Sequence, residues 1–116
     1  MLGLRVTGVR SGRTFDLPVQ YAVQQGAEED ALVVVPLHHE RKTWWRNLRV
    51  AAPLLVLYDG RWRPAYGRLV GPDDPEHAAA LATYARRWPR ADLPPEQPVV
   101  ALRPVEGPHW SSTARG

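Results

Sequence analysis

The strongest structural signal in the chain is the stretch Leu54-Leu55-Val56-Leu57-Tyr58-Asp59-Gly60-Arg61-Trp62. An Asp-Gly pair between two apolar segments is typical of a two-residue β-hairpin turn, because both turn residues need backbone conformations that most other residues tolerate poorly. We therefore expect strands over Leu54–Tyr58 and Arg61–Val70, with Trp62 and Tyr66 on one face of the second strand.

Strand patterns also dominate the sequence before this hairpin. Alternating apolar residues predict strands over Leu4–Thr7 and Leu17–Val23, which the glycine-containing turn between them would join as a hairpin. On the second of these strands, one face would carry Leu17, Val19, Tyr21 and Val23. The uninterrupted apolar run Ala31–Pro36 is typical of a strand covered on both faces, so we expect it at the centre of the sheet.

Helical patterns occur twice. Apolar residues recur at helical spacing after Thr43, a favourable N-cap residue, which predicts a short helix over Thr43–Ala52 that ends before Pro53. Asp73-Asp74-Pro75 predicts the start of a second helix with Pro75 at its first position, and Arg86-Arg87 would lie favourably at its negative end. The apolar stripe of this second helix would consist of Ala78, Leu81, Ala82 and Ala85.

The predicted elements define the fold class. With a last strand over Val99–Val105, their order is β-β-β-α-β-β-α-β, a mainly β chain with two short helices. A parallel sheet would need a helix at nearly every crossover, so an antiparallel sheet curled into a small barrel fits better. The 116 residues suffice for one domain, which we place at 1–106, with 107–116 as a flexible C-terminal tail.

Composition excludes several classes of protein. The chain has no cysteine, hence no disulfide and no thiolate metal site, and its longest apolar runs are too short for a membrane span. The N-terminal residues lack the pattern of a secretory signal, so we expect a cytoplasmic protein. Lys42 is the only lysine among 15 basic residues, and the net charge of +3 is too modest to predict nucleic-acid binding. The excess of arginine reflects either genomic base composition or an anionic partner.

Familiar catalytic and cofactor motifs are absent from the sequence. Ser11 does not lie in a Gly-x-Ser-x-Gly motif, and neither a P-loop nor a Rossmann glycine pattern occurs. His38-His39-Glu40 is the only metal-like cluster, but neighbouring residues of an extended chain point to opposite faces. We therefore expect a solvated loop there and no metal site.

Basic residues at two backbone turns are the remaining candidates for chemistry. Arg10-Ser11-Gly12-Arg13 combines two guanidinium groups, a hydroxyl and exposed amides, which suit a phosphate. Arg41-Lys42 precedes the predicted helix, whose free N–H groups favour an anion. For each segment taken singly, a solvated turn or a surface helix face is an equally good interpretation.

Several motifs together resemble the deazaflavin-dependent nitroreductase family. They are Thr7-Gly8-Val9-Arg10-Ser11-Gly12, Leu17-Pro18-Val19-Gln20-Tyr21, Leu32-Val33-Val34-Val35 and Trp44-Trp45-Arg46-Asn47-Leu48 followed by Pro53. The resemblance covers about Arg5 to Pro104 and implies a homodimer with the split β-barrel fold of pyridoxamine-phosphate oxidase. It also implies a reductase that transfers hydride from the reduced deazaflavin coenzyme F-420 to a quinone-like or other conjugated small molecule.

The resemblance also implies roles for individual residues. The turn that binds the phosphate and acidic tail of the coenzyme in relatives corresponds here to Arg10, Ser11, Gly12 and Arg13, with Lys42 also available to the tail. The segment that lies against the ring corresponds to Val34, Val35, Pro36, Leu37 and His38, and this segment would be supported by Trp44 and Asn47. The substrate pocket would be lined by Trp45, Tyr84 and Trp88, with Tyr84 as a candidate proton donor.

Two alternatives within the same fold stay open. Flavin mononucleotide (FMN) has a single phosphate and needs fewer cations than F-420. A binding protein without a cofactor is favoured by Val9 and Phe15, which stand where relatives carry cations, and by the bulky loop Leu37–Glu40. A homodimer is expected independently, because so short an open barrel buries only about two-thirds of its unfolded surface.

Overall fold

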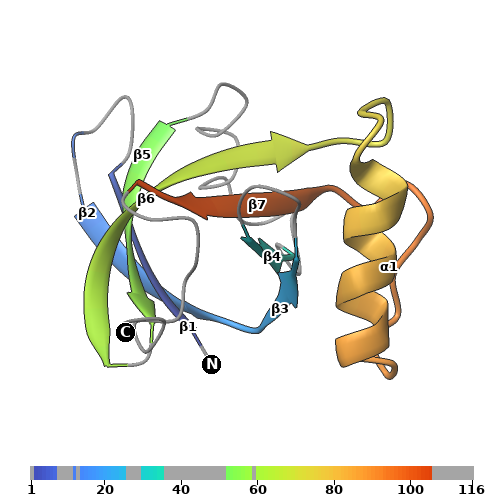
Figure 1. Cartoon of the computed structure of the whole chain (residues 1–116), viewed down its shortest axis with the longest axis horizontal. Helices are drawn as coiled ribbons and strands as arrows, with labels where there is room; N and C mark the ends of the chain where they lie inside the picture. Colours follow the sequence, from blue (N-terminus) through green and yellow to red (C-terminus); the bar gives the residue numbers. More distant parts are fainter. Residues whose placement is uncertain are drawn as a thin grey trace.

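The computed structural model describes residues 2–7, 12, 14–25, 30–35, 52–58 and 60–105. Over these residues it contains seven strands and one helix (Figure 1). In chain order they are β1 (Leu2–Thr7), β2 (Thr14–Val19), β3 (Tyr21–Gln24), β4 (Ala31–Val34), β5 (Ala52–Tyr58), β6 (Arg61–Val70), α1 (His77–Arg87) and β7 (Val99–Pro104).

The seven strands form one antiparallel sheet with the order β2-β1-β5-β6-β7-β4-β3. Its two outermost strands, β2 and β3, are consecutive in the chain and separated only by Gln20. The chain itself therefore joins the two ends of the strand order, and the sheet curls into a nearly closed barrel (Figure 1). The prediction of a mainly β chain with a split β-barrel is confirmed.

Both predicted hairpins form. β1 and β2 pair from Leu2↔Val19 to Thr7↔Thr14, and β5 and β6 pair up to Tyr58↔Arg61 at the Asp-Gly turn. Gly60 in this turn has φ = +76°, a left-handed conformation that glycine adopts without steric cost. Local turn chemistry was therefore sufficient to predict these two pairings.

Two apolar layers hold the sheet together. The barrel interior contains Leu2, Leu4, Val6, Leu32, Val34, Leu54, Val56, Ala65, Val100 and Leu102. The second layer lies between the sheet and α1 and contains Ala22, Val33, Val35, Val70, Ala80, Tyr84, Val99 and Ala101. From Leu32 to Val35, successive residues contribute alternately to the two layers, which explains why all four of these residues are buried. The expectation that this strand is covered on both faces is confirmed, but its expected place at the centre of the sheet is wrong, because β4 is next to last in the strand order.

The predicted single strand over Leu17–Val23 is wrong, because the chain changes its pairing partner at Gln20. β2 pairs with β1, whereas β3 pairs with β4. The expected inner face holds only in part: Val19 and Tyr21 pack against the barrel interior, but Val23 is 44% exposed. β3 is the last strand of the order with a neighbour on one side, so nothing among the described strands covers Val23.

The predicted start and buried face of the second helix are also wrong. α1 begins at His77 after the N-cap residue Glu76, because the Asp74 carboxylate accepts the Glu76 N–H and forms an Asx turn there. The buried face consists of His77, Ala80 and Tyr84, with Leu81 packed beside it. From the expected stripe, the side chains of Ala78, Ala82 and Ala85 are exposed. Tyr84 offers far more apolar surface than an alanine, so its ring determines which face turns to the sheet.

The helix predicted over Thr43–Ala52 lies outside the described residues except at its last position. Ala52 and Pro53 belong to β5, which begins two residues before the predicted Leu54. The pairing of β1 with β5 covers only Leu55, Val56 and Leu57. Pro53 therefore lies beyond the β1 partners, where a missing N–H costs no ladder hydrogen bond on that side. The predicted tail 107–116 also lies outside the described residues.

Candidate functional site

The structure describes five of the residues predicted to bind coenzyme or substrate: Gly12, Val34, Val35, Tyr84 and Trp88. Outside the described residues lie Arg10, Ser11, Arg13, Pro36, Leu37, His38, Lys42, Trp44, Trp45 and Asn47, together with the cluster His38-His39-Glu40. The candidate site therefore consists of these five described residues and the described side chains around them.

Gly12 lies between β1 and β2 with φ = +69°. A Cβ atom at this position would meet no atom within 4 Å, so the backbone there is open as well as left-handed. Val34 is fully buried in the barrel interior, and Val35 is 4% exposed in the layer under α1. Both valine side chains are thus core residues, so a ligand beside Val34 and Val35 would meet the backbone of these two residues rather than their side chains.

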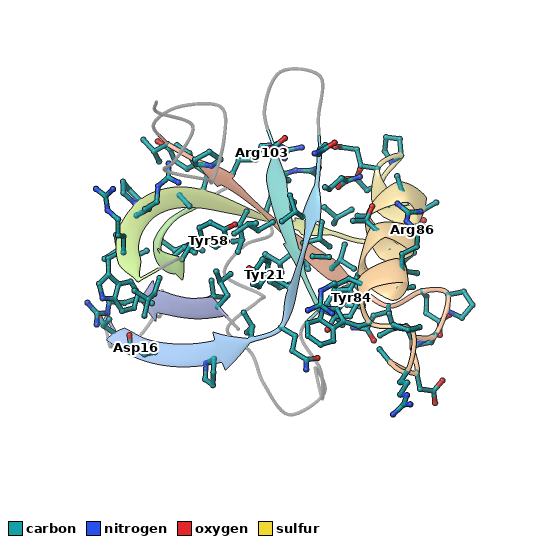
Figure 2. All side chains as sticks on the ribbon, turned by 60° about the horizontal axis from the view of Figure 1, so that its bottom comes forward. Asp16, Tyr21, Tyr58, Tyr84, Arg86 and Arg103 are labelled. Carbon is teal, nitrogen blue, oxygen red and sulfur yellow. The ribbon has the colours of Figure 1, made fainter. Side chains whose placement is uncertain are left out.

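Tyr84 and Trp88 are one helical turn apart but lie in different surroundings. Tyr84 is 1% exposed and packs between the sheet and α1 (Figure 2). Burial raises the pKa of its phenol, so the hydroxyl stays protonated at neutral pH. The Trp88 indole is half-buried, and its Nε1–H donates to the Tyr21 carbonyl oxygen at 2.9 Å. Of these two aromatic residues, only Trp88 therefore lies at an accessible surface.

That surface is a groove between β3 and α1, which we call the β3–α1 groove. It consists of two adjoining hollows of about 490 and 520 Å³ that share Val23, Thr83 and Arg86. Its strand side is formed by Tyr21, Ala22, Val23, Gln24 and Gln25. Its helix side is formed by Ala79, Ala82, Thr83, Arg86, Arg87 and Trp88. The short side chains of α1 leave this space open.

Sequence analysis did not predict the groove. Arg86-Arg87 was expected to lie at the helix end, which is confirmed, but its effect was assigned to the helix dipole alone. The signal available in the sequence was the spacing of Ala79, Ala82 and Thr83 one turn before the arginines. That spacing acquires a meaning only once β3 is known to lie alongside α1.

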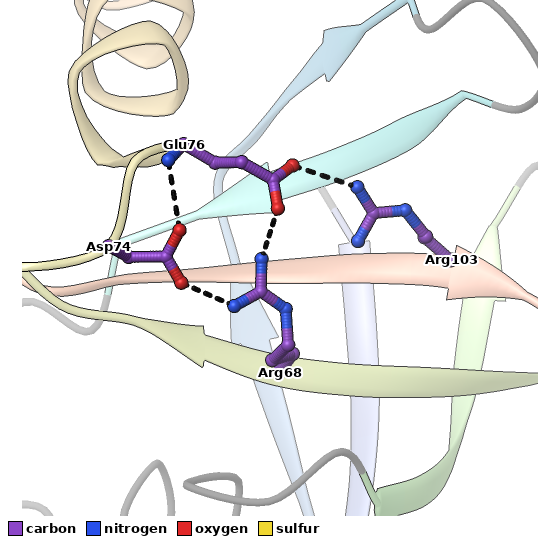
Figure 3. Close-up of polar contacts among 4 residues, drawn as sticks. All are labelled: Arg68, Asp74, Glu76 and Arg103. Atoms are coloured by element: carbon purple, nitrogen blue, oxygen red, sulfur yellow. Dashed lines mark hydrogen bonds and ion pairs between the residues drawn. The ribbon is translucent and has the colours of Figure 1, made fainter.

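A second group of charged side chains fixes the start of α1 (Figure 3). Arg68 on β6 donates to the carboxylates of Asp74 at 2.5 Å and Glu76 at 2.6 Å, and Arg103 on β7 donates to Glu76 at 3.3 Å. The Glu76 N–H, first, and Arg68, second, hold the pKa of Asp74 below its usual value. We call these four residues the α1 anchor, because they tie the helix start to two strands.

Another ion pair joins the two strands of the first hairpin, β1 and β2. Arg5 on β1 donates from Nε to Asp16 on β2 at 2.8 Å, and its guanidinium carbon lies 4.3 Å from the ring centroid of Trp62. The hydrogen bond from Arg5 holds the pKa of Asp16 below its usual value. This pair lies on the outer face of the barrel, away from the β3–α1 groove.

Within the described ranges, no group of three or more His, Asp or Glu side chains is placed to hold a metal ion. In the same ranges, no helix is both long and apolar enough to cross a membrane.

The chain was compared with protein-family models, curated proteins and solved structures. No family model, no curated protein and no solved structure matches the chain.

Proposed function

We propose that this chain is a split-barrel reductase that uses the deazaflavin coenzyme F-420 to reduce a quinone-like or other conjugated small molecule. The proposal is supported by the motifs around Arg10, Asn47 and the strand Ala31–Val34, which resemble those of the deazaflavin-dependent nitroreductases. It is supported also by a barrel with the strand pairing described above.

The direction of the strands is the observation that carries the proposal. Every neighbouring pair in the sheet is antiparallel, so strands at alternate places in the order run the same way. β1 and β4 are two such strands, and both therefore end at the same end of the barrel. β1 leads into the proposed tail-binding turn at Arg10–Arg13, and β4 leads into the proposed ring-binding segment at Pro36–His38. A single coenzyme can bind both segments only if they begin at the same end of the barrel.

The described residues fit the proposed coenzyme in two respects. The open, left-handed backbone at Gly12 leaves space beside this residue for an anion. Val34 and Val35 are fixed by burial on both sides of β4, so the backbone at its end is rigid. The deazaflavin itself supplies the hydride, and the protein has to hold the tail, orient the ring and exclude water. Such a reaction does not require a catalytic acid among the described residues.

A fluorescence titration with F-420 and, in parallel, with FMN tests this proposal. Binding of F-420 alone in the micromolar range is the expected result. Binding of FMN alone would show that FMN rather than F-420 is the coenzyme, and the proposal of an oxidoreductase would stand. Binding of neither would overturn the proposal in favour of a split-barrel binding protein without a cofactor.

The tail-binding role is tested by paired double variants. Arg10→Ala/Arg13→Ala is expected to weaken F-420 binding by about tenfold or more at low salt, because two charge-assisted contacts are removed. Arg90→Ala/Arg115→Ala removes the same charge elsewhere and is expected to change the affinity by less than about twofold. Equal losses in the two titrations would contradict the tail-binding assignment.

We also propose that the protein is a homodimer formed through the outer face of β5 and β6. Trp62 is 40% exposed and Tyr66 is 50% exposed on this face. The partners opposite them on β5 are Leu57 and Pro53. We call these four residues the β5–β6 patch. Exposed apolar side chains that share one face of a sheet favour association with another protein surface.

A further inference from the structure

β3 presents an open edge beside α1. It occupies the last place in the strand order, and among the described residues it pairs only with β4. In an antiparallel ladder, alternate residues direct both their N–H and their C=O to the same side. The Tyr21 carbonyl accepts the Trp88 indole from the side of the helix. The next residue with backbone groups directed to that side is Val23, which lines both hollows of the groove.

Two arginines line the same groove without carboxylate partners. Over the described residues, Arg5, Arg68 and Arg103 form ion pairs within 4.0 Å, whereas Arg86 and Arg87 form none with any described carboxylate. Stacking on the Trp88 ring at 4.0 Å holds the guanidinium of Arg87. Arg86 makes only a long contact of 3.5 Å with the Thr83 hydroxyl, so most of its donors remain available (Figure 2).

The described charged residues that line the groove therefore carry charge of one sign, which is positive. Among the described residues that line it, the charged side chains are Arg86 and Arg87, and the uncharged polar ones are Tyr21, Gln24, Gln25, Thr83 and Trp88. An open strand edge is normally protected by charge, a bulge or a covering segment, because it can pair with another chain. Here the flanking charges attract rather than repel an acidic segment.

We propose that the β3–α1 groove binds an extended acidic peptide of a partner protein, which adds to β3 as a further strand. The peptide backbone pairs with the N–H and C=O of Val23, and its carboxylates pair with Arg86 and Arg87. Strand addition supplies affinity through main-chain hydrogen bonds, and the side chains at alternate positions supply selectivity. The four residues of β3 limit the bound segment to a few residues, so the complex is weak and sensitive to salt.

Fluorescence polarisation with a labelled peptide, acetyl-Thr-Glu-Val-Glu-Thr-amide, tests the proposal at low ionic strength. Saturable binding is expected, and Arg86→Gln/Arg87→Gln should weaken it by about tenfold, since two charge-assisted contacts are lost. The matched control is Arg61→Gln/Arg90→Gln, which removes two exposed arginines outside the groove. It should change the affinity by less than about twofold.

Peptide variants separate strand addition from charge attraction. Proline in place of the central valine keeps both carboxylates but removes an N–H, so binding should be lost. A single-stranded oligodeoxynucleotide of the same charge should not compete, because it cannot pair with β3. Absence of peptide binding, equal binding of the proline peptide, competition by the oligonucleotide, or equal losses in the two arginine variants would each overturn the proposal. Amide shifts confined to β3 and α1 in a ¹⁵N spectrum would support it.

Discussion

At the scale of single residues, Tyr84 shows how a residue assigned to a pocket can serve the core. Its ring is 1% exposed in the layer between the sheet and α1. The aromatic ring at this position, rather than the alanines of the expected stripe, sets the face of the helix that is buried. A sequence pattern dominated by alanine contains little information about this choice, because each alanine buries only a small area.

We expect Tyr84→Ala to lower the free energy of unfolding by about 3–5 kcal/mol, because it leaves a cavity in a packed layer. Tyr84→Phe keeps the ring and should change the free energy by less than about 1 kcal/mol. Urea denaturation followed by tryptophan fluorescence measures both. A Tyr84→Phe variant that is as stable as the parent but loses reductase turnover would show that the hydroxyl takes part in the reaction.

Gly60 offers a second test at this scale. Its φ is +76°, and a Cβ added there would have no atom within 4 Å, so alanine at Gly60 would meet backbone strain but no clash. Gly60→Ala should therefore cost about 1–2 kcal/mol of unfolding free energy. Gly71→Ala is the matched control, since Gly71 has equal space and no left-handed φ. Equal thermal stabilities of the two variants would contradict this account of the turn.

At the scale of secondary-structure elements, the α1 anchor joins the helix start to β6, which precedes it in the chain, and to β7, which follows it. Asp74 could be predicted as a residue near the helix start from the Asp-Asp-Pro pattern alone. Its pair with Arg68 spans only six residues, but the bridge through Glu76 to Arg103 spans 27 and could not be predicted, because it depends on β6 and β7 being neighbours with Arg68 opposite Ala101. Local sequence gives the approximate start of an element more readily than the identity of the element that it contacts.

The anchor makes stability depend on pH. The pKa of Asp74 is lower in the folded chain than the unfolded value of about 3.9, so its contribution is complete well above that value and is lost as pH falls through the folded pKa. We expect Asp74→Asn, which keeps an oxygen for the Glu76 N–H, to be less stable than the parent at pH 7 and closer to it at pH 3.

Urea unfolding at the two pH values measures this effect. Asp16 also has a lowered pKa, so Asp16→Asn serves as the comparison for a charge pair that does not involve α1. A parent and an Asp74→Asn variant that differ by the same amount at both pH values would show that the carboxylate charge is not the cause.

At the scale of the whole molecule, the described residues divide the outer face of the sheet into two parts. α1 covers β3, β4 and β7 but not the β5–β6 patch, where the Arg5 guanidinium of β1 stacks on Trp62. The strands on either side of this boundary were predicted from alternation and turns. The barrel was predicted, but the change of pairing partner at Gln20 was not, because no glycine or proline stands at that position to mark it.

The proposed homodimer gives a prediction at this scale. Trp62→Lys/Tyr66→Lys should shift the protein from dimer to monomer in analytical ultracentrifugation, because charged groups replace the apolar centre of the patch. Val23→Lys changes a similarly exposed apolar side chain outside the patch and should leave the dimer intact. A monomeric parent protein, or equal dissociation of both variants, would contradict the assignment of this face.

The position of β7 between β6 and β4 has a consequence for the order of folding. Without β7, the strands fall into two groups, β2-β1-β5-β6 and β4-β3. The chain connects these two groups, but no hydrogen bonds between strands do. β7 begins at Val99, near the end of the 116-residue chain. During synthesis on the ribosome, hairpins can therefore form early, but the barrel can close only after β7, the last of the described strands, has emerged.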